Sequence, residues 1–444
     1  MVNCTTMMVG MLLMPAGRPN SIGFVEDPQT GARCHWNRAN DEALCEEILV
    51  YIQDSWRTQV DEEGWPEPFS DGGAGGSDGL DFYLDTSAEW GAYTDSSYAD
   101  KDESDGRMGA EAYVVIDPRI TEEMNLFVAH EFNHVLQYAT DMSEPALPPW
   151  EAAATVAEEV TYPGEGSWKS VAPDFNNTPW ESLLGDGYHL WDDHEIWSFY
   201  EYGTSVWLEH LQANYDVAAV DLWWAMTNPT WQNEPDVWDA YDAVTGDATR
   251  ALVSLSIERA RMGRSDAPDW AAGADAPVST QGTLANLDEW VTPEFKPQDL
   301  GVVYFDVTAS GRQGFEIDGS DETRWRLIDV ETGNVWGGMD VGVVEGPGLV
   351  GVVNIGPAGL ETDDICDWSN GCRFPGRDVS VRLVELPEDE TGLIDSGVDD
   401  TGEPMDTGGD GEDGDCGCSS GAGGGLPMGL WGLAGLALWR RRRC

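Results

Sequence analysis

Basic residues are scarce in this chain of 444 residues, which has 23 Lys and Arg against 82 Asp and Glu and a formal net charge of -59. Such a chain repels phosphate backbones and anionic lipid, so nucleic acid is not an expected partner. Solubility is the simplest interpretation of the acidity, and cation binding is the alternative. The length suits two or three domains with a substantial core, and the 21 tryptophans argue against a chain that is disordered throughout.

The chain also lacks any CxxC motif, although it has eight cysteines. Cys34 and Cys45 are close in sequence, as are Cys366 and Cys372, and each pair could close a short loop. Neither pair has a clear set of further metal ligands, so we expect two disulfides rather than a metal site. Disulfides of this kind indicate an exported protein.

Long apolar runs are missing as well. The first run, Met7 to Met14, is short and follows no Lys or Arg, so residues 1–20 are a candidate secretory signal that lacks its basic end. The last run, Leu426 to Trp439, is shorter than the roughly 20 residues that a spanning helix needs. Arg440 to Arg443 follow it directly, which fits a cytoplasmic stop.

Residues 388–415 contain no aromatic and no basic residue, which predicts an acidic disordered stalk. The density of Asp and Gly would also permit weak Ca²⁺ binding. No complete EF-hand spacing is present, so a solvated stalk is the preferred interpretation.

The chemistry is expected in the middle of the chain. Residues 79–87 and 110–118 have the composition of strands, and the second is an expected edge strand. Thr121 is a suitable N-cap and two acidic residues follow it, so a helix is predicted from about Glu122 to Ala139.

Two of the six histidines lie on this predicted helix, four residues apart in the stretch "HEFNH". His130 and His134 project from one face, where neutral imidazoles on adjacent turns can share one Zn²⁺. Glu131 is rotated by about 100° from His130, which suits a base acting on water better than a ligand. The alternative is an exposed polar helix face. The apolar flanks predict a buried helix instead, and buried histidines need partners.

A catalytic zinc needs a third protein ligand. Pro148 to Tyr162 predicts a second helix, with Glu151 placed 17 residues after His134 and Glu158 two turns further on, on roughly the same face. Either glutamate could reach the metal, and solvated surface acids are the alternative for both. Glu151 is the preferred ligand, and Glu159 is expected at the surface.

With these residues the chain resembles the gluzincin class of zinc metallopeptidases. It is similar to a group of secreted bacterial proteins with HEFxHxxQ followed by a W…EAxAT…E segment, which stand here at His130 to Gln137 and Trp150 to Glu158. The resemblance covers about residues 79 to 215, and a departure is that Trp150 directly adjoins Glu151. It implies an α+β zincin-like fold, with a mixed sheet above the HExxH helix and a helical lower half.

The resemblance also implies that peptide bonds of a protein or peptide substrate are hydrolysed by water that the zinc activates, with Glu131 as general base. A donor must stabilise the oxyanion. Residues 187–203 offer candidates, of which Tyr202 and His189 are chosen as catalytic residues. An aromatic core position is the alternative for each of them.

The remaining segments complete the expected organisation. Helices are predicted around Trp207 to Leu211 and from Asp242 to Gly263, and short strands recur from Gly301 onwards. We therefore expect a metallopeptidase domain at residues 21–275 and a β-sandwich accessory domain at residues 276–387.

Residues 416–444 resemble the MYXO-CTERM sorting tail of myxobacterial and related surface proteins. The shared features are a Cys-containing Gly/Ser motif, a short apolar helix and an arginine cluster. The resemblance implies processing near Cys416 or Cys418, with membrane contact through the tail before processing. It implies display on the cell surface (outer membrane) or release outside the cell.

The leading hypothesis is therefore an exported zinc endopeptidase. A rival is a catalytically inactive surface adhesion or spacer protein with a metallopeptidase-like domain. The presence of Glu131 argues against this rival, because a purely structural zinc site has no need of a base. Zinc chemistry on a non-peptide amide or ester is a third hypothesis.

Overall fold

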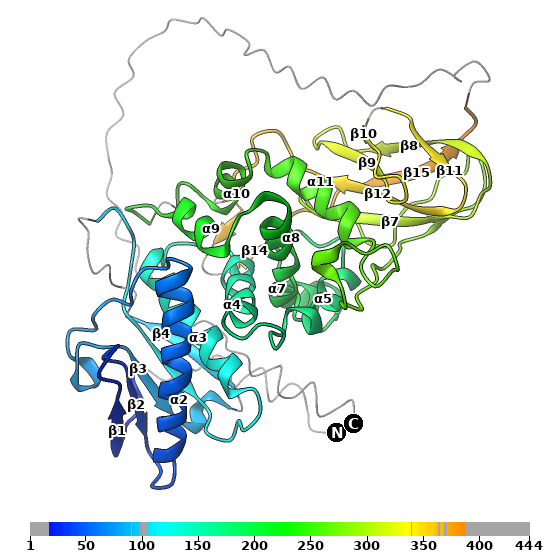
Figure 1. Ribbon diagram of the computed structural model, residues 1–444. Coiled ribbons are helices and arrows are strands. Elements are labelled where there is room, and N and C mark those ends of the chain that lie inside the picture. Colours follow the sequence, from blue (N-terminus) through cyan, green and yellow to red (C-terminus); the bar gives the residue numbers. More distant parts are fainter. Residues whose placement is uncertain are drawn as a thin grey trace, which may run out of the picture.

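The structure is a computed structural model that describes residues 17–386 except residues 90, 98, 100–104, 232, 339, 363–364 and 368–370. The acidic stalk, the sorting tail and all but the last four residues of the candidate signal lie outside this range. The described chain is a mixed α+β protein, as expected. Figure 1 shows one β unit at each end of the molecule and helices between them.

The N-terminal sheet has the strand order β1-β2-β3-β5-β4. Its strands are β1 (Gly23–Glu26), β2 (Arg33–Trp36), β3 (Asp81–Leu84), β4 (Ala92–Ser96) and β5 (Ala112–Ile116). The pairs β2–β3 and β3–β5 are parallel, whereas β4 runs antiparallel to β5. The sequence predicted β5 as an edge strand, but β5 is the second strand from that side of the sheet. The edge next to it is formed by β4, which was not predicted from the sequence. Its residues alternate between buried and half-buried, because successive side chains of a strand point to opposite faces of the sheet.

Two helices cover one face of this sheet (Figure 1): α2 (Glu42–Ser55) and α3 (Met124–Thr140). Phe82 and Val114 point into the main core beneath them, while Tyr83 and Val115 form a small cluster on the opposite face. This is the side-chain alternation of a β-strand. A disulfide joins Cys34 of β2 to Cys45 of α2, as predicted.

The predicted start of α3 was wrong by two residues. Glu123 lies immediately before the helix in a left-handed conformation, with φ of 61°, and the structure shows no side-chain cap. Thr121 therefore does not cap the helix. A positive φ is unfavourable for a residue with a side chain, and Glu123 adopts it at the point where the chain turns from the loop after β5 into α3.

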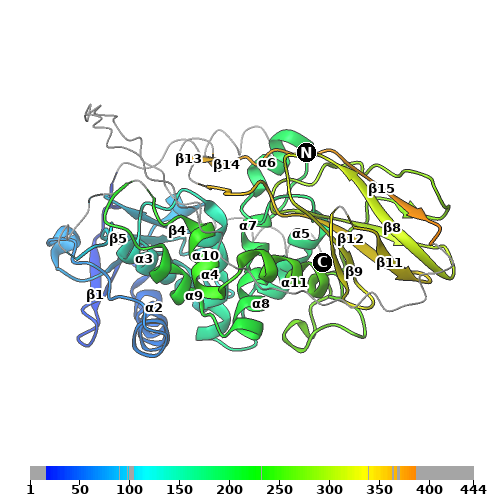
Figure 2. The same ribbon diagram turned by 90° about the horizontal axis from the view of Figure 1, so that it is seen from above.

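The middle of the chain is helical, and Figure 2 shows these helices between the two β units. They are α4 (Leu147–Thr161), α5 (Trp168–Asn177), α6 (Gly187–His194), α7 (Tyr200–Gly203), α8 (Ser205–Tyr215), α9 (Ala219–Met226), α10 (Val237–Thr245) and α11 (Ala248–Arg259). The single helix predicted from Asp242 to Gly263 is in fact two. The chain breaks at Gly246, where φ is 74°, and the side chain of Asp247 accepts a hydrogen bond from the backbone of Arg250 to start α11.

The C-terminal β unit contains two antiparallel-rich sheets. One has the order β10-β9-β12-β7-β6 and the other β11-β8-β15. Their bounds are β6 (Thr283–Leu284), β7 (Val302–Val307), β8 (Arg312–Gly319), β9 (Trp325–Asp329), β10 (Val335–Gly337), β11 (Gly342–Glu345), β12 (Gly348–Asn354) and β15 (Val379–Val384). Phe305, Leu327 and Val352 of the first sheet share one hydrophobic cluster with Phe315 and Val381 of the second.

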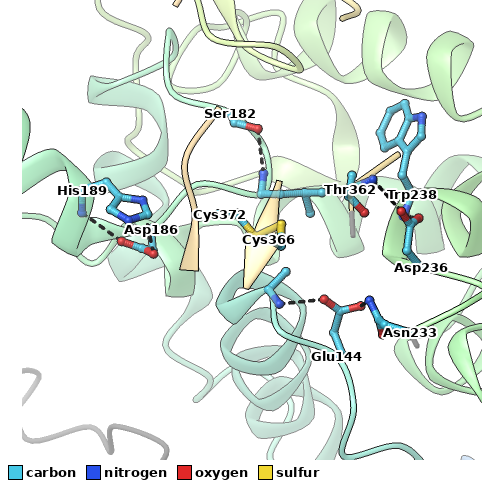
Figure 3. Close-up of a disulfide and its surroundings, with 12 residues drawn as sticks. Glu144, Ser182, Asp186, His189, Asn233, Asp236, Trp238, Thr362, Cys366 and Cys372 are labelled. Carbon is cyan, nitrogen blue, oxygen red and sulfur yellow. Dashed lines mark hydrogen bonds and ion pairs between the residues drawn. A yellow bond between two sulfur atoms is a disulfide. The ribbon is translucent and has the colours of Figure 1, made fainter. Parts of the chain in front are cut away.

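The segment between β12 and β15 leaves these sheets and packs against the helices. It contains a short hairpin of β13 (Cys366–Asp367) and β14 (Gly371–Cys372), closed by the predicted Cys366–Cys372 disulfide. Both cysteines belong to the main core cluster, together with residues of the helical region. Figure 3 shows the disulfide between Asp186 and His189 on one side and Glu144 and Asp236 on the other.

Candidate metal centre

Helix α3 presents its polar residues to the protein interior. Every residue from Phe127 to Thr140 is buried, including His130, Glu131 and His134, each at most 1 % exposed. The sheet lies on one side of this helix and α4 on the other. The exposed polar face that was the alternative in the sequence is therefore excluded, and these side chains need polar partners inside the protein.

Helix α4 supplies a carboxylate to the two histidines. Oε2 of Glu151 lies 3.2 Å from Nε2 of His130 and 3.6 Å from Nε2 of His134. One donor atom from each of these three residues lies within 4.8 Å of the other two. Two imidazole nitrogens and a carboxylate oxygen at this separation form a buried group that could bind a metal ion.

Unpaired polar atoms around this group fit such an ion. Nε2 of His134, Oε1 of Glu151 and Oε1 of Glu131 are buried and have no hydrogen-bond partner among the described residues. Leaving three buried polar atoms unsatisfied in one place is costly unless something else pairs with them. A cation with one or more water molecules would satisfy all three.

Glu158 acts on the other side of the His130 ring. Its Oε1 lies 2.9 Å from Nδ1 of His130, while its Oε2 accepts a hydrogen bond from the backbone N–H of Ser167 at 3.0 Å. The acceptor at Nδ1 favours the tautomer that leaves Nε2 free on the side of Glu151. Glu158 is thus close to the histidine but is placed to orient it, whereas Glu151 faces the shared space.

His134 is oriented in the same way by an amide. Oε1 of Gln137 lies 2.6 Å from Nδ1 of His134, and Nε2 of Gln137 donates to the backbone carbonyl of Trp150 at 2.9 Å. Because Trp150 directly precedes Glu151, one side chain links both helices of the group.

Glu131 lies beside the group, and its position depends on the edge strand. Oγ1 of Thr94 in β4 lies 2.8 Å from Oε2 of Glu131 and 3.0 Å from its backbone carbonyl. The other carboxylate oxygen, Oε1, is left unpaired, as described above. Thr94 and its strand were both missed in the sequence, and the alternation in "AYTDS" is the signal that could have found them.

Burial and charge shift the acid–base properties of these groups. Burial lowers the pKa of His130, but hydrogen bonds to Glu151 and Glu158 outweigh this effect and raise it to about 10. Burial would raise the pKa of Glu151, but His134 and His130 lower it to about 2. Burial raises the pKa of Glu131. Without another cation the group therefore holds a proton, and a metal ion would have to displace that proton to bind.

The two catalytic donors chosen from the sequence have different positions. The ring of Tyr202 stacks on that of His130, with 5.8 Å between centroids, and burial raises the pKa of Tyr202 well above its usual value. Its hydroxyl is thus a hydrogen-bond donor at neutral pH. His189, in contrast, is not part of the group of mutually close metal donors in the described chain. Its Nδ1 lies 3.5 Å from Oδ2 of Asp186.

A second tyrosine, Tyr188, is influenced by the charge of Glu151. Tyr188, on α6, is 37 % exposed, and its pKa is raised well above its usual value by partial burial first and then by the negative charges of Glu201 and Glu151. Tyr188 was among several candidates in the sequence and was not chosen. Its partial exposure distinguishes it from Tyr202, which is 5 % exposed.

The disulfide hairpin packs against α6 (Figure 3). Gly371 has φ of 65°, and a Cβ atom there would lie 2.7 Å from Oδ2 of Asp186, so glycine is required for this close approach. On the other side, the backbone N–H of Thr362 donates to Oδ2 of Asp236 at 2.6 Å. The C-terminal segment thus lies against the start of α6, the helix that carries Tyr188.

Both predicted disulfides are present, which is typical of proteins from an oxidising compartment. None of the helices in the described ranges is long and apolar enough to span a membrane. No protein-family model matches this chain, and no curated protein matches it.

Proposed function

We propose that this protein is an exported zinc-dependent endopeptidase of the gluzincin type, with a zincin-like domain, a β-sandwich accessory domain and surface display through the C-terminal tail. The observation that carries the proposal is the buried group of His130, His134 and Glu151 with Glu131 beside it. The group offers three protein ligands, the number that is typical of catalytic rather than structural zinc sites. The intact base Glu131 favours this function over an inactive adhesion or spacer protein.

The roles follow from the contacts of each residue. When bound, Zn²⁺ supplies a Lewis acid that lowers the pKa of water and polarises a carbonyl. His130, His134 and Glu151 would hold it, and Glu158 and Gln137 keep both imidazoles in the required tautomers. Glu151 is preferred to Glu158 as the third ligand because Glu158 already occupies Nδ1 of His130.

Glu131 is the general base of the proposed reaction. Thr94 holds one of its oxygens, and the unpaired Oε1 is available to accept the proton of the attacking water and pass it to the leaving amine. Tyr202 and Tyr188 both remain protonated at neutral pH and are the candidate donors to the oxyanion. His189 is the weaker candidate, because its Nδ1 lies 3.5 Å from Oδ2 of Asp186, whereas the ring of Tyr202 stacks on that of His130.

The decisive experiment compares the full-length protein with Glu131→Gln. Bound zinc is measured by elemental analysis, and hydrolysis is measured with an unfolded protein. We expect about one zinc per chain in both proteins. We expect a loss of activity of at least about 100-fold in Glu131→Gln. Glu159→Gln is the matched control, because Glu159 lies on α4 next to Glu158 and its Oε1 accepts a hydrogen bond from the backbone N–H of Gly164.

Each contrary outcome identifies a different error. Absence of zinc from the wild-type protein would exclude the metal centre. Equal, negligible activity in both zinc-loaded proteins would favour the inactive surface protein. Hydrolysis of simple esters or amides, but of no peptide, would assign the same centre to another substrate class.

A further inference from the structure

An exposed tryptophan ends a series of aromatic rings that begins at the proposed metal centre. Trp197 is 63 % exposed and belongs to the segment between α6 and α7. The exposed Trp224 and Trp290 have arginines over their rings, at 5.6 Å for Arg107 and 4.4 Å for Arg382. Trp197 instead packs edge-on against other rings, at 6.4 Å from Trp191 and 6.1 Å from Phe199.

These rings form an unbroken series that reaches the metal centre. The centroid of Phe199 lies 5.9 Å from that of Tyr202, which in turn stacks on His130 at 5.8 Å. Exposure rises along the series, from the buried His130 and Tyr202 through the half-buried Phe199 to the exposed Trp197. The series therefore connects the proposed site of cleavage to the protein surface.

The surroundings of the exposed end are acidic. Asp192 and Asp193 at the end of α6 and Glu195 directly after it are exposed, and Arg373 pairs with the two aspartates. Acidic groups at this surface, on a protein with a net charge of -59, disfavour an acidic partner. An apolar ring face with negative charge around it suits an aromatic or large aliphatic side chain on a neutral or basic peptide.

From this arrangement we infer that Trp197, Phe199 and Trp191 form an aromatic platform that binds a large apolar side chain of the peptide substrate near the scissile bond. The inference rests on the proposed function, because its occupant is the substrate of that reaction. It adds a selectivity for peptides with Phe, Tyr, Trp or Leu near the cleaved bond and against peptides with Asp or Glu there.

The test uses full-length, zinc-loaded protein and peptides that differ only at one position within three residues of the cleaved bond, where they carry Phe, Ala or Asp. Cleavage sites in an unfolded protein, mapped by mass spectrometry, define that position. Binding of the same peptides to the Glu131→Gln protein, measured by fluorescence anisotropy, gives a second readout that does not depend on turnover. The variants are Trp197→Ala and Trp197→Phe, and Trp290→Ala is the control on the C-terminal β unit.

We expect the wild-type protein to prefer the Phe peptide to the Ala peptide by about tenfold in both kcat/KM and Kd, as burial of an apolar ring predicts. Trp197→Ala should abolish that ratio, Trp197→Phe should keep most of it, and Trp290→Ala should leave it unchanged. Because Trp197 is largely exposed, zinc content and Tm should be the same in all variants.

Other outcomes overturn the inference. An unchanged Phe-to-Ala ratio in Trp197→Ala, in both readouts, would exclude the platform. A Trp197-dependent dimer in sedimentation without any peptide preference would assign the surface to self-association and would also exclude it. If Trp197-dependent binding is found but no peptide is cleaved by the zinc-loaded wild type, the platform stands and the proposed peptidase function fails.

Discussion

Oε1 of Glu158 lies 2.9 Å from Nδ1 of His130, on the opposite side of the ring from Glu151. The two glutamates that compete for the same role in the sequence therefore have separate roles around one imidazole. Glu151 faces the second histidine, and Glu158 fixes the ring. Substituting each glutamate separately therefore tests which of them is a metal ligand.

Substitution of these two glutamates should weaken metal binding to different extents. Glu158→Gln removes the charge that orients His130 and should lower zinc affinity about 10- to 100-fold. Glu151→Gln removes a ligand and should lower it further. Zinc affinity is measured by competition with a chromogenic chelator, and Glu159→Gln should behave as wild type. A larger loss in Glu158→Gln than in Glu151→Gln would show that the assignment is reversed.

Thr94 should affect turnover without affecting metal binding. Thr94→Val keeps the shape of the side chain but removes the hydroxyl group that holds Oε2 of Glu131. We expect kcat to fall about tenfold, equivalent to one lost hydrogen bond, with unchanged KM and zinc content. Thr94→Ser retains the hydroxyl and should recover most of kcat. A matching loss in both variants would indicate disturbed packing of β4 instead of a positioning role.

Stability should fall between mildly acidic and mildly basic pH, in part because of Glu181. Burial raises the pKa of this carboxyl to about 8 from an ordinary value of 4.5. Between these values the folded state keeps a proton that the unfolded chain has released. Each pH unit therefore removes up to about 1.4 kcal/mol of stability as the pH rises through this window.

Glu181→Gln tests this pH dependence. The amide oxygen can still accept the hydrogen bond that Nε2 of Gln298 donates at 2.9 Å, but it does not titrate. We expect a smaller difference in unfolding free energy between pH 5 and pH 8 than in the wild type, measured by denaturant titration. The exposed Glu294→Gln should preserve the wild-type difference. An unchanged slope in Glu181→Gln would show that this carboxyl is ionised in the folded protein.

The Cys366–Cys372 disulfide should stabilise the folded protein by holding the β13–β14 hairpin against the helices. It closes a loop with a sequence separation of 6. Replacing both cysteines by Ala should cost about 2 kcal/mol in the free energy of unfolding, from the chain entropy of a short loop. Adding reductant to this double variant then measures the contribution of Cys34–Cys45 separately. No loss in the double variant would mean that packing and the Thr362–Asp236 hydrogen bond suffice.

Much of the local structure around the candidate metal centre was predictable. Apolar periodicity predicts the helix with His130 and His134. The helix with Glu151 is predicted by the prolines in its first turn and by its own apolar periodicity. The errors occurred where local patterns are weak. Glu123 adopts a left-handed conformation in place of a Thr121 cap, Gly246 divides a helix, and β4 is too short and polar to stand out.

The sequence by itself determined the chemistry available to this protein: two imidazoles four residues apart on a buried helix, a carboxylate beside the first, two short-range disulfides and a strongly acidic balance. These features depend on residue type and on spacing along one helix or loop. Only the tertiary structure brought Glu151 close to both histidines, placed Glu158 at Nδ1 of His130 and Thr94 at Glu131, and gave Tyr202 and His189 different neighbours. Those relationships join residues from different elements, and their distances are set by how sheet, helices and the returning hairpin pack together.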